Sequence, residues 1–533
     1  MGDEYEAIVI GAGFAGLRML HELRRLGVAA RVLEAGTDVG GTWYWNRYPG
    51  ARTDSESWVY CFWFDQELLQ DWDWNARFPA QEEVYAYLRH AADRLDLRRD
   101  IQFSTRVVAA HYDEEANGWS VVTAAGERFH CTYLIAATGF FSVTYEPPFE
   151  GLPSFGGDWY QTSRWPKEGV DFTGKRVGVV GTGATGVQVI PEVAHAATEV
   201  TVFQRTANYV IPSRNHPLED HQQRAIKANY GAIWEQCLRQ VFAFPIQRTY
   251  RFADDFTAEE RERIFEAGWE TGGFRFIFET FDDITANAQS NEAACEFVRN
   301  KIRTIVKDPQ TAELLCPQGH PIGAKRIPLG HHYYETFNRD HVHLASVAGN
   351  PIERITEGGI RLADGGEYEL DAIVFAVGFD AGTGALTQMD VRGRAGRTIA
   401  EDWRGGARTY LGMAIEGFPN LFTIAGAHGP LANVPILIDR QVAFVGRAIE
   451  HLRDHGYASI EATPQAVDAF AEQLQRLLDG TLLGDAAKVG SYYLGANIPG
   501  KAHTTLVYFG GAAKYFKEIS AVADREFDGF ALA

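Results

Sequence analysis

The chain is poor in cysteine and contains no closely spaced cysteine pair. Its 533 residues include five cysteines, and none of these is separated from another by only two residues. This pattern excludes a disulfide scaffold and a thiolate zinc site, and it fits a reducing compartment. The five residues are Cys61, Cys131, Cys237, Cys295 and Cys316.

Long apolar runs and an excess of positive charge are also missing. No stretch approaches the roughly 20 apolar residues that span a bilayer, and the N-terminus lacks a basic region followed by an apolar one. Acidic residues outnumber basic ones by 70 to 50, giving a formal net charge of −20. This balance argues against nucleic acid or an anionic membrane as the main partner. We therefore expect a cytoplasmic protein, and nothing in the sequence implies an obligate protein partner.

Two other kinds of site find no support. There is no GxSxG segment, so a hydrolase of that type is not indicated. His331 and His332 are adjacent, but neighbouring side chains on a strand or helix point apart, and no third ligand has suitable spacing. We therefore predict no metal site.

What the chain has in quantity is glycine, with 54 residues, and two of its glycine-rich loops have the same pattern. Each follows a short apolar strand, at 7–10 and at 177–180, and precedes a predicted helix, in the order strand, GxGxxG, helix. A further strand of the first fold is expected at 134–137. The first glycine allows a tight turn, the second lets a pyrophosphate approach the backbone, and the third lets helix and strand pack closely. The loops are Gly11-Ala12-Gly13-Phe14-Ala15-Gly16 and Gly181-Thr182-Gly183-Ala184-Thr185-Gly186.

The residue that ends the next strand differs between the two loops. Twenty-three residues after Gly11 lies Glu34, whereas twenty-three residues after Gly181 lies Gln204, followed by Arg205. An acid at this place binds a free ribose 2′-hydroxyl, and a neutral residue followed by arginine accepts a 2′-phosphate. The sequence therefore predicts FAD at the first loop and NADPH at the second.

The length and the pattern along the chain predict an α/β protein with two Rossmann-type dinucleotide-binding domains and a helical insertion. The insertion is expected at 218–321, where glycine becomes rare and charged helical patterns appear. Strand patterns return after it, so both nucleotide domains are predicted to be discontinuous. The FAD-binding domain would comprise 1–142 and 378–533, and the NADP-binding domain 150–217 and 322–377.

Two longer motifs resemble the fingerprints of the Baeyer–Villiger monooxygenases. The segment FGGDWYQTSRWP at 155–166 is similar to that family's FxGxxxHxxxWP, with Gln161 in place of the histidine. The segment GTWYWNRYPGARTD at 41–54 matches [AG]GxWxxxx[FY]P[GM]xxxD at every fixed position. Segments 324–326, 333–339 and 495–501 also look like cyclohexanone and phenylacetone monooxygenases, so the resemblance spans the chain. Val377 and Tyr492 are smaller departures, because relatives usually have threonine and often tryptophan there.

The resemblance implies a reaction. NADPH would reduce FAD, O₂ would add to give a C4a-peroxyflavin, and this would convert a ketone into an ester or lactone; sulfides would also be oxidised. Arg326 matches the family's catalytic arginine and, because arginine keeps its proton, suits a permanent countercharge to the anions of this reaction. Asp54 would pair with Arg326 and hold it near the flavin. Gln161 cannot carry a proton, so we expect it to alter coupling to NADPH while activity is kept.

Further site residues are predicted partly from spacing and partly from the resemblance. Arg205 has the spacing argument, and Thr206 and Lys325 would join it at the 2′-phosphate. The other cofactor-binding candidates are Gly41, Thr42, Trp43, Tyr48, Gln188 and Tyr492. The pocket for the small-molecule ketone would include Leu431, Asn433, Pro435 and Tyr492.

Three other functions remain open at this stage. An N- or S-oxygenating flavin monooxygenase would share both loops, although the 41–54 segment and Arg326 favour ketone oxidation. A flavoprotein reductase or peroxide-forming NADPH oxidase is a second alternative; the missing cysteine pair counts against the reductase, and Gln161 leaves the oxidase open. A non-catalytic FAD- and NADPH-binding redox sensor is the third, but it would not need both Asp54 and Arg326.

Overall fold

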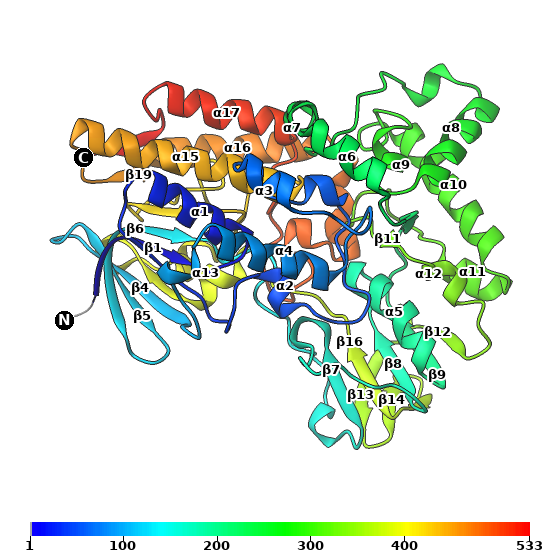
Figure 1. Cartoon of the computed structure of the whole chain (residues 1–533). Coiled ribbons are helices and arrows are strands. Elements are labelled where there is room, and N and C mark those ends of the chain that lie inside the picture. The colour runs from blue at the N-terminus through cyan, green and yellow to red at the C-terminus, as the bar shows by residue number, and fades with distance from the viewer. Residues whose placement is uncertain (1–2) are drawn as a thin grey trace.

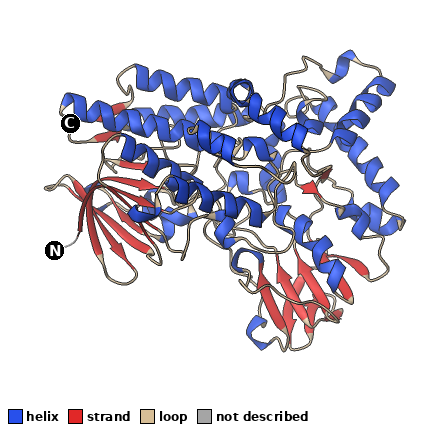
Figure 2. Ribbon diagram, viewed as in Figure 1, coloured by secondary structure: helices blue, strands red, loops and turns tan. Residues whose placement is uncertain are grey.

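The computed structural model describes residues 3–533, apart from the side chains of residues 3 and 485. Two large sheets lie apart in the molecule, with helices packed around and between them (Figures 1 and 2). The predicted α/β class with two Rossmann-type folds is confirmed.

The first sheet is built around a parallel core that begins at the N-terminus. In this core β1 (Asp3–Ile10) lies between β2 (Ala30–Leu33) and β6 (Arg128–Ala136), and β3 (Ile101–Gln102) follows β2. Helix α1 (Phe14–Arg25) connects β1 to β2, as a dinucleotide fold requires. Two strands from far along the chain, β17 (Asp390–Arg392) and β18 (Leu421–Thr423), complete the sheet.

The antiparallel part of this sheet was not predicted from the sequence. Strands β4 (Val107–Asp113) and β5 (Gly118–Thr123) form a hairpin that pairs with β6. This pairing makes β6 longer than the strand expected at 134–137, because its first half pairs with β5 as well as with β1.

The second sheet is parallel throughout. Its order is β12 (Val342–Ser346), β9 (Glu199–Gln204), β8 (Arg176–Val180), β16 (Ala372–Phe375) and β7 (Asp158–Gln161). Helix α5 (Ala184–Ala196) joins β8 to β9. A small antiparallel sheet of β13 (Ile352–Thr356), β14 (Gly359–Leu362) and β15 (Glu367–Glu369) lies near it.

Residues 218–321 contain helices and no strand. They form the green region at the upper right of Figure 1. The longer helices are α6 (Asp220–Ala228), α7 (Tyr230–Arg239), α8 (Ala258–Thr271), α10 (Ala288–Ile305) and α11 (Pro309–Leu315). The chain then re-enters the centre through β11 (Leu329–Gly330), which pairs in parallel with β10 (Ile211–Pro212), and through α12 (Tyr333–Thr336).

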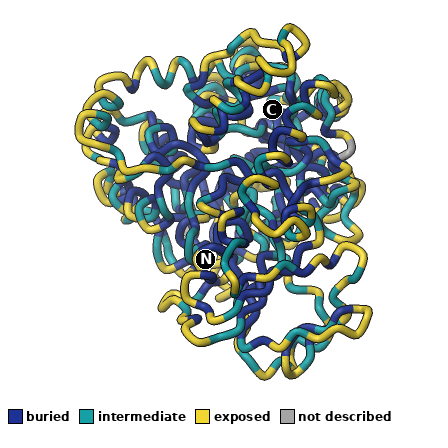
Figure 3. The backbone as a smooth tube through the Cα atoms, turned by 90° about the vertical axis from the view of Figure 1, so that its right-hand side faces the viewer, coloured by how far each residue is buried: buried dark blue, intermediate teal, exposed yellow. Residues whose placement is uncertain are grey.

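The C-terminal part covers the first sheet with helices. Helix α15 (Val434–His455) packs on α1 and on α17 (Ala512–Asp524), and α16 (Pro464–Asp479) lies beside them (Figure 1). Buried residues run through the middle of the molecule, while exposed residues gather on loops and outer helices (Figure 3). Within residues 3–533, no helix combines the length and the apolar character needed to cross a bilayer.

Candidate active site

Gly11 is required by the geometry of the first glycine-rich loop. Its φ is +103°, and a Cβ there would lie 2.7 Å from the carbonyl oxygen of Ala137. A Cβ on Gly16 would lie 1.8 Å from the Gly11 carbonyl oxygen, so helix and turn can meet only without side chains. Helix α1 starts at Phe14 with Gly13 as its N-cap and no side chain capping it. The first turn therefore offers backbone N–H groups to an anionic ligand.

The second loop repeats this geometry after β8, the middle strand of the other sheet. Gly181 has a φ of +109°, and its Cβ would lie 2.5 Å from the Ala376 carbonyl oxygen. A Cβ on Gly186 would lie 2.2 Å from the Gly181 carbonyl oxygen. Gly183 caps α5 without a side chain, and a Cβ there would meet nothing within 4 Å. This open approach to a helix N-terminus fits a second dinucleotide.

Glu34 lies where a ribose-binding acid is needed. It is buried, and its two carboxylate oxygens accept hydrogen bonds from Ala12 N at 2.7 Å and Gly36 N at 2.6 Å. Burial raises the pKa of Glu34, and these two N–H groups oppose that rise. Each oxygen retains a further lone pair, so the residues of the first loop fit the ribose of FAD.

After the second loop, the adjacent residues Gln204 and Arg205 have different surroundings. Gln204 is buried, and its Nε2 donates to the carbonyl oxygen of Leu314 in α11 at 2.7 Å, so its amide is engaged by the helical segment. Arg205 is exposed. Thr206 is held from the glycine-rich loop, because Thr182 Oγ1 donates to its carbonyl oxygen at 3.1 Å.

Lys325 joins this neighbourhood from a distant part of the chain. Burial lowers the pKa of Lys325 to about 8, and the positive charge of Arg205 acts in the same direction. Two cations that repel one another in this way suit a ligand with a double negative charge. The donor set therefore fits the 2′-phosphate of NADPH.

Asp54 and Arg326 form an ion pair. Asp54 Oδ2 lies 3.0 Å from Arg326 Nη2 and accepts its hydrogen bond, although the two residues are 272 positions apart. The Asp54 side chain is 5% exposed, whereas that of Arg326 is 40% exposed and can reach a ligand. Burial alone would lower the pKa of Arg326, but the charge of Asp54, together with Tyr492, Tyr493 and the hydrogen bond to Asp54, more than offsets this and raises it. Arg326 is therefore a fixed cation with a fixed partner.

The segment that contains Asp54 also contacts the first glycine-rich loop and the helix that follows the second. A Cβ on Gly41 would lie 2.8 Å from the Cα of Gly13, so the two glycines are packed against each other. Tyr48 donates its hydroxyl to Gln188 Oε1 at 2.7 Å, and Gln188 Nε2 donates to the Arg52 carbonyl oxygen at 3.0 Å. Both ends of the Gln188 amide are thus bound by protein, and they tie α5 to residues 48–52.

The aromatic residues of this segment differ in their surroundings. Trp43 is buried in the core, where its Nε1 donates to the Tyr60 hydroxyl at 3.3 Å. Phe14 is also a core residue, with its ring 5.3 Å from that of Tyr60. Thr42 is exposed, and Tyr48 is half-buried.

Two of the four predicted substrate residues lie near the segment that leads to Arg326. Tyr492 and Leu431 pack in one apolar cluster with Ala324, two residues before Arg326. Burial raises the pKa of Tyr492, and the charge of Arg326 opposes this. Asn433 is different: it is 1% exposed, and its Nδ2 donates to the Val59 carbonyl oxygen at 2.5 Å. Pro435 is buried in the first turn of α15.

The sequence reasoning missed several aromatic neighbours of this site. The ring of Tyr492 lies 5.1 Å from Phe141, 6.1 Å from Phe140 and 4.7 Å from Tyr493. Phe140 and Phe141 follow the carboxyl end of β6, the edge where ligands bind in parallel sheets. That rule, applied to the strand at 134–137, was the signal available for finding them.

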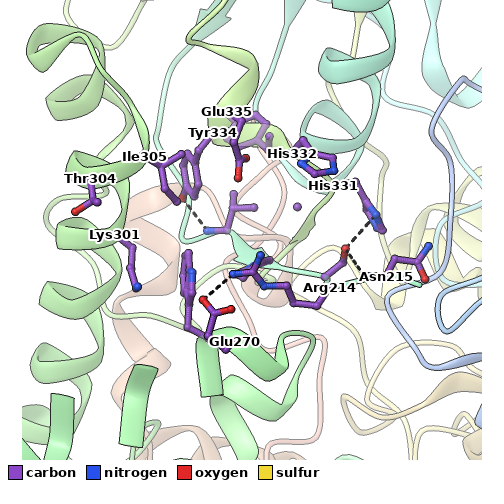
Figure 4. A pocket seen from close by; sticks show the side chains of 16 residues that line it. Arg214, Asn215, Glu270, Lys301, Thr304, Ile305, His331, His332, Tyr334 and Glu335 are labelled. Carbon is purple, nitrogen blue, oxygen red and sulfur yellow. Dashed lines mark hydrogen bonds and ion pairs between the residues drawn. The ribbon is translucent and has the colours of Figure 1, made fainter. Parts of the chain in front are cut away.

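A separate hollow of about 420 Å³ lies between β10, α8, α10 and α12 (Figure 4). Its lining includes Arg214, Trp269, Lys301 and the pair His331 and His332, but none of the predicted site residues. Burial lowers the pKa of His331 to about 3, helped by the charge of Arg52, so this imidazole is neutral. No three His, Cys, Asp or Glu side chains in the described part of the chain are grouped to hold a metal ion.

Comparison with known proteins places this arrangement among flavoproteins. Residues 5–227 match the family model described as flavin-binding monooxygenase-like. The chain is 45% identical to a Baeyer–Villiger monooxygenase of Pseudooceanicola batsensis, with 98% of this chain and 95% of the relative covered. It is 41% identical to the acetone monooxygenase (methyl acetate-forming) of Gordonia sp. (strain TY-5), with 99% of each covered. A solved structure of an oxidized steroid monooxygenase bound to NADP superimposes with a TM-score of 0.94 at 44% identity, covering 99% of both chains.

Proposed function

The chain belongs to the Baeyer–Villiger monooxygenases, NADPH- and FAD-dependent enzymes that insert one oxygen atom of O₂ next to a ketone carbonyl, and we propose that Arg326 is the catalytic cation of this chain. The observation that carries the proposal is the 3.0 Å ion pair with Asp54, which leaves the Arg326 side chain 40% exposed.

Two sets of residues would hold the cofactors. The loop 11–16, Glu34 and the segment 41–54 fit FAD, and the loop 181–186 with Arg205, Thr206 and Lys325 fits NADPH. When bound, NADPH supplies electrons and FAD supplies the activation of O₂. The glycine-rich loops orient both groups through helix N-termini that carry no capping side chain.

Arg326 acts by charge. Negative charge develops on the attacking oxygen and on the carbonyl oxygen during the reaction, and a cation placed beforehand stabilises it without reorganisation. Arginine is suited to this because its proton is not lost at working pH, and Asp54 reinforces that state. Asp54 also fixes the direction of the guanidinium, which keeps it from swinging into solvent.

The substrate we propose is a small ketone held by apolar contacts. Leu431 and Tyr492 support this, because both lie in the apolar cluster that reaches Ala324. One similar protein is named an acetone monooxygenase and another a steroid monooxygenase, so these relatives are named for substrates of very different size. Sulfides are a second substrate class that the same residues would serve.

We also propose a division of the chain into three parts. The FAD-binding part would be 1–142 with 378–533, of which residues 1 and 2 lie outside the described residues. The NADP-binding part would be 150–217 with 322–377, and 218–321 would be the helical insertion. Sheet membership supports the division, since β17 and β18 join the first sheet while β12 and β16 join the second.

The function is tested by measuring stoichiometry with a panel of ketones. NADPH consumed, hydrogen peroxide released and ester formed are measured together, and each product is identified by mass spectrometry. One ester or lactone per NADPH is the expected result. Peroxide in place of ester across the whole panel would indicate an NADPH oxidase, and oxidation confined to amines or sulfides would indicate the other class of flavin monooxygenase.

A further inference from the structure

Asn208 connects the end of β9 to the backbone of Arg326. It is buried, and its Nδ2 donates to the Arg326 carbonyl oxygen at 3.0 Å. Its Oδ1 accepts a hydrogen bond from Tyr209 N at 3.0 Å. The N–H of Tyr209 can only donate and the carbonyl of Arg326 can only accept, so the two partners determine which end of the amide faces Arg326.

The backbone around Asn208 is held as well. The hydroxyl of Tyr334 accepts from Val210 N at 3.1 Å and donates to the Asn208 carbonyl oxygen at 3.4 Å. Immediately beyond, β10 and β11 pair in parallel, with Ile211 opposite Leu329. The strand that follows Asn208 and the strand that follows Arg326 therefore run side by side, and the amide bridge lies just before this pairing.

Asn208 also lies three residues after Arg205 and two after Thr206, the segment proposed to read the 2′-phosphate. The hydrogen bond from Thr182 to the Thr206 carbonyl ties this segment to the second glycine-rich loop. A ligand that binds Arg205 and Thr206 thus contacts a stretch of backbone that continues to Asn208, whose buried side chain binds the Arg326 carbonyl oxygen.

We propose that Asn208 is a positioning residue that acts through Arg326 and couples it to the phosphate-reading segment. Asp54 holds the guanidinium and Asn208 holds the backbone, so the cation is fixed at both ends. The inference rests on the proposed role of Arg326. It adds that occupation of the 2′-phosphate site and the placement of the reacting cation are linked through one amide.

The substitution Asn208→Asp tests the link with almost no change of shape. The carboxylate keeps an acceptor for Tyr209 N but turns an oxygen towards the Arg326 carbonyl, where a donor is needed. Because a buried carbonyl would lose its partner and face a repulsive oxygen, we expect ester formation per bound flavin to fall about tenfold. We also expect peroxide released per NADPH to rise, and the Kd for NADP⁺ to increase about threefold or more while the Kd for NAD⁺ stays near its parent value.

Asn420→Asp is the matched control. Asn420 is also buried, and its amide likewise bridges two backbone groups, donating to the Ala458 carbonyl oxygen at 3.1 Å and accepting from Ile460 N at 2.9 Å. The substitution Asn420→Asp likewise removes a donor to a backbone carbonyl, but next to β18 of the first sheet. We expect a comparable loss of thermal stability with an unchanged ratio of peroxide to ester and unchanged affinity for NADP⁺.

The outcomes separate three cases. If Asn208→Asp keeps the parent ratio of peroxide to ester and the parent Kd values, Asn208 is only structural and the inference is overturned. If Arg326→Ala still forms ester at the parent rate, the proposed function of Arg326 fails first. Should Asn208→Asp not retain flavin, Asn208→Ala removes the donor without adding a repulsive oxygen, and the same two readouts decide.

Discussion

The affinity of this enzyme for a 2′-phosphate should fall as pH rises through about 8. Burial and the charge of Arg205 lower the pKa of Lys325 to about 8. Lys325 is then about nine-tenths charged at pH 7 and about one-tenth charged at pH 9. If only the charged form makes the charge-assisted contact with phosphate, the Kd for a 2′-phosphate ligand rises about tenfold over that interval.

The assay is calorimetric titration with 2′,5′-ADP at pH 7, 8 and 9 and constant ionic strength. This ligand carries the 2′-phosphate without the nicotinamide, and because the second pKa of a phosphate is about 6, its 2′-phosphate is about nine-tenths or more doubly charged throughout. 5′-AMP is the ligand control and should show no such trend. Lys325→Met should weaken binding at pH 7 and flatten the pH profile. Arg205→Ala should move the fall to higher pH, since it removes the charge that helps to lower the pKa of Lys325.

A constant Kd for 2′,5′-ADP from pH 7 to 9 would refute the assignment of Lys325. Stability offers a second check of opposite sign. Because the pKa of Lys325 is lower in the folded protein than in the unfolded chain, folding releases a proton between about pH 8 and pH 10.5. The ligand-free protein should therefore gain stability from this residue as pH rises through that window, while its affinity for phosphate is already falling.

Three further outcomes are expected. Arg326→Ala should still permit flavin reduction by NADPH in stopped-flow absorbance but lower ester formation about a hundredfold or more, because a fixed charge is lost; ester at the parent rate would remove Arg326 from the mechanism. Arg205→Ala should raise the KM for NADPH about tenfold and leave the KM for NADH nearly unchanged, whereas equal effects would contradict its phosphate contact. Gln161 donates from its Nε2 to the Tyr145 carbonyl oxygen at 2.7 Å. The substitution Gln161→His should alter the peroxide released per NADPH while activity is kept. Unchanged leakage and unchanged rate would reject that role.

The parts of the fold that the sequence predicts are those set by short-range rules. Gly11 and Gly181 have positive φ values and no room for a Cβ, and a GxGxxG pattern after a strand reports both requirements locally. The hairpin of β4 and β5 was not predicted, because its pairing with β6 depends on a surface that the rest of the sheet provides. Strand ends differ from the expected ones for the same reason.

The site shows a similar division. Spacing placed Glu34 beside its loop, and the resemblance singled out Asp54 and Arg326, which the fold brings together. Three candidate site residues have side-chain amides whose hydrogen-bond partners could not be predicted. Gln204 binds Leu314, Gln188 binds Tyr48 and Arg52, and Asn433 binds Val59. Each partner is distant in sequence, and the choice is made by packing alone. The roles of these residues at a cofactor or substrate stay predictions.

The two hydrogen bonds that join α5 to residues 48–52 use a phenol, an amide and a peptide carbonyl, all uncharged. Dissolved ions screen exposed charges but have little effect on contacts of this kind. Raising the salt concentration should thus lower the affinity for NADPH at concentrations well below those that disturb the contact between α5 and residues 48–52. The enzyme should therefore release NADPH at high salt concentration while α5 stays joined to residues 48–52. It should bind NADPH again when the salt is diluted.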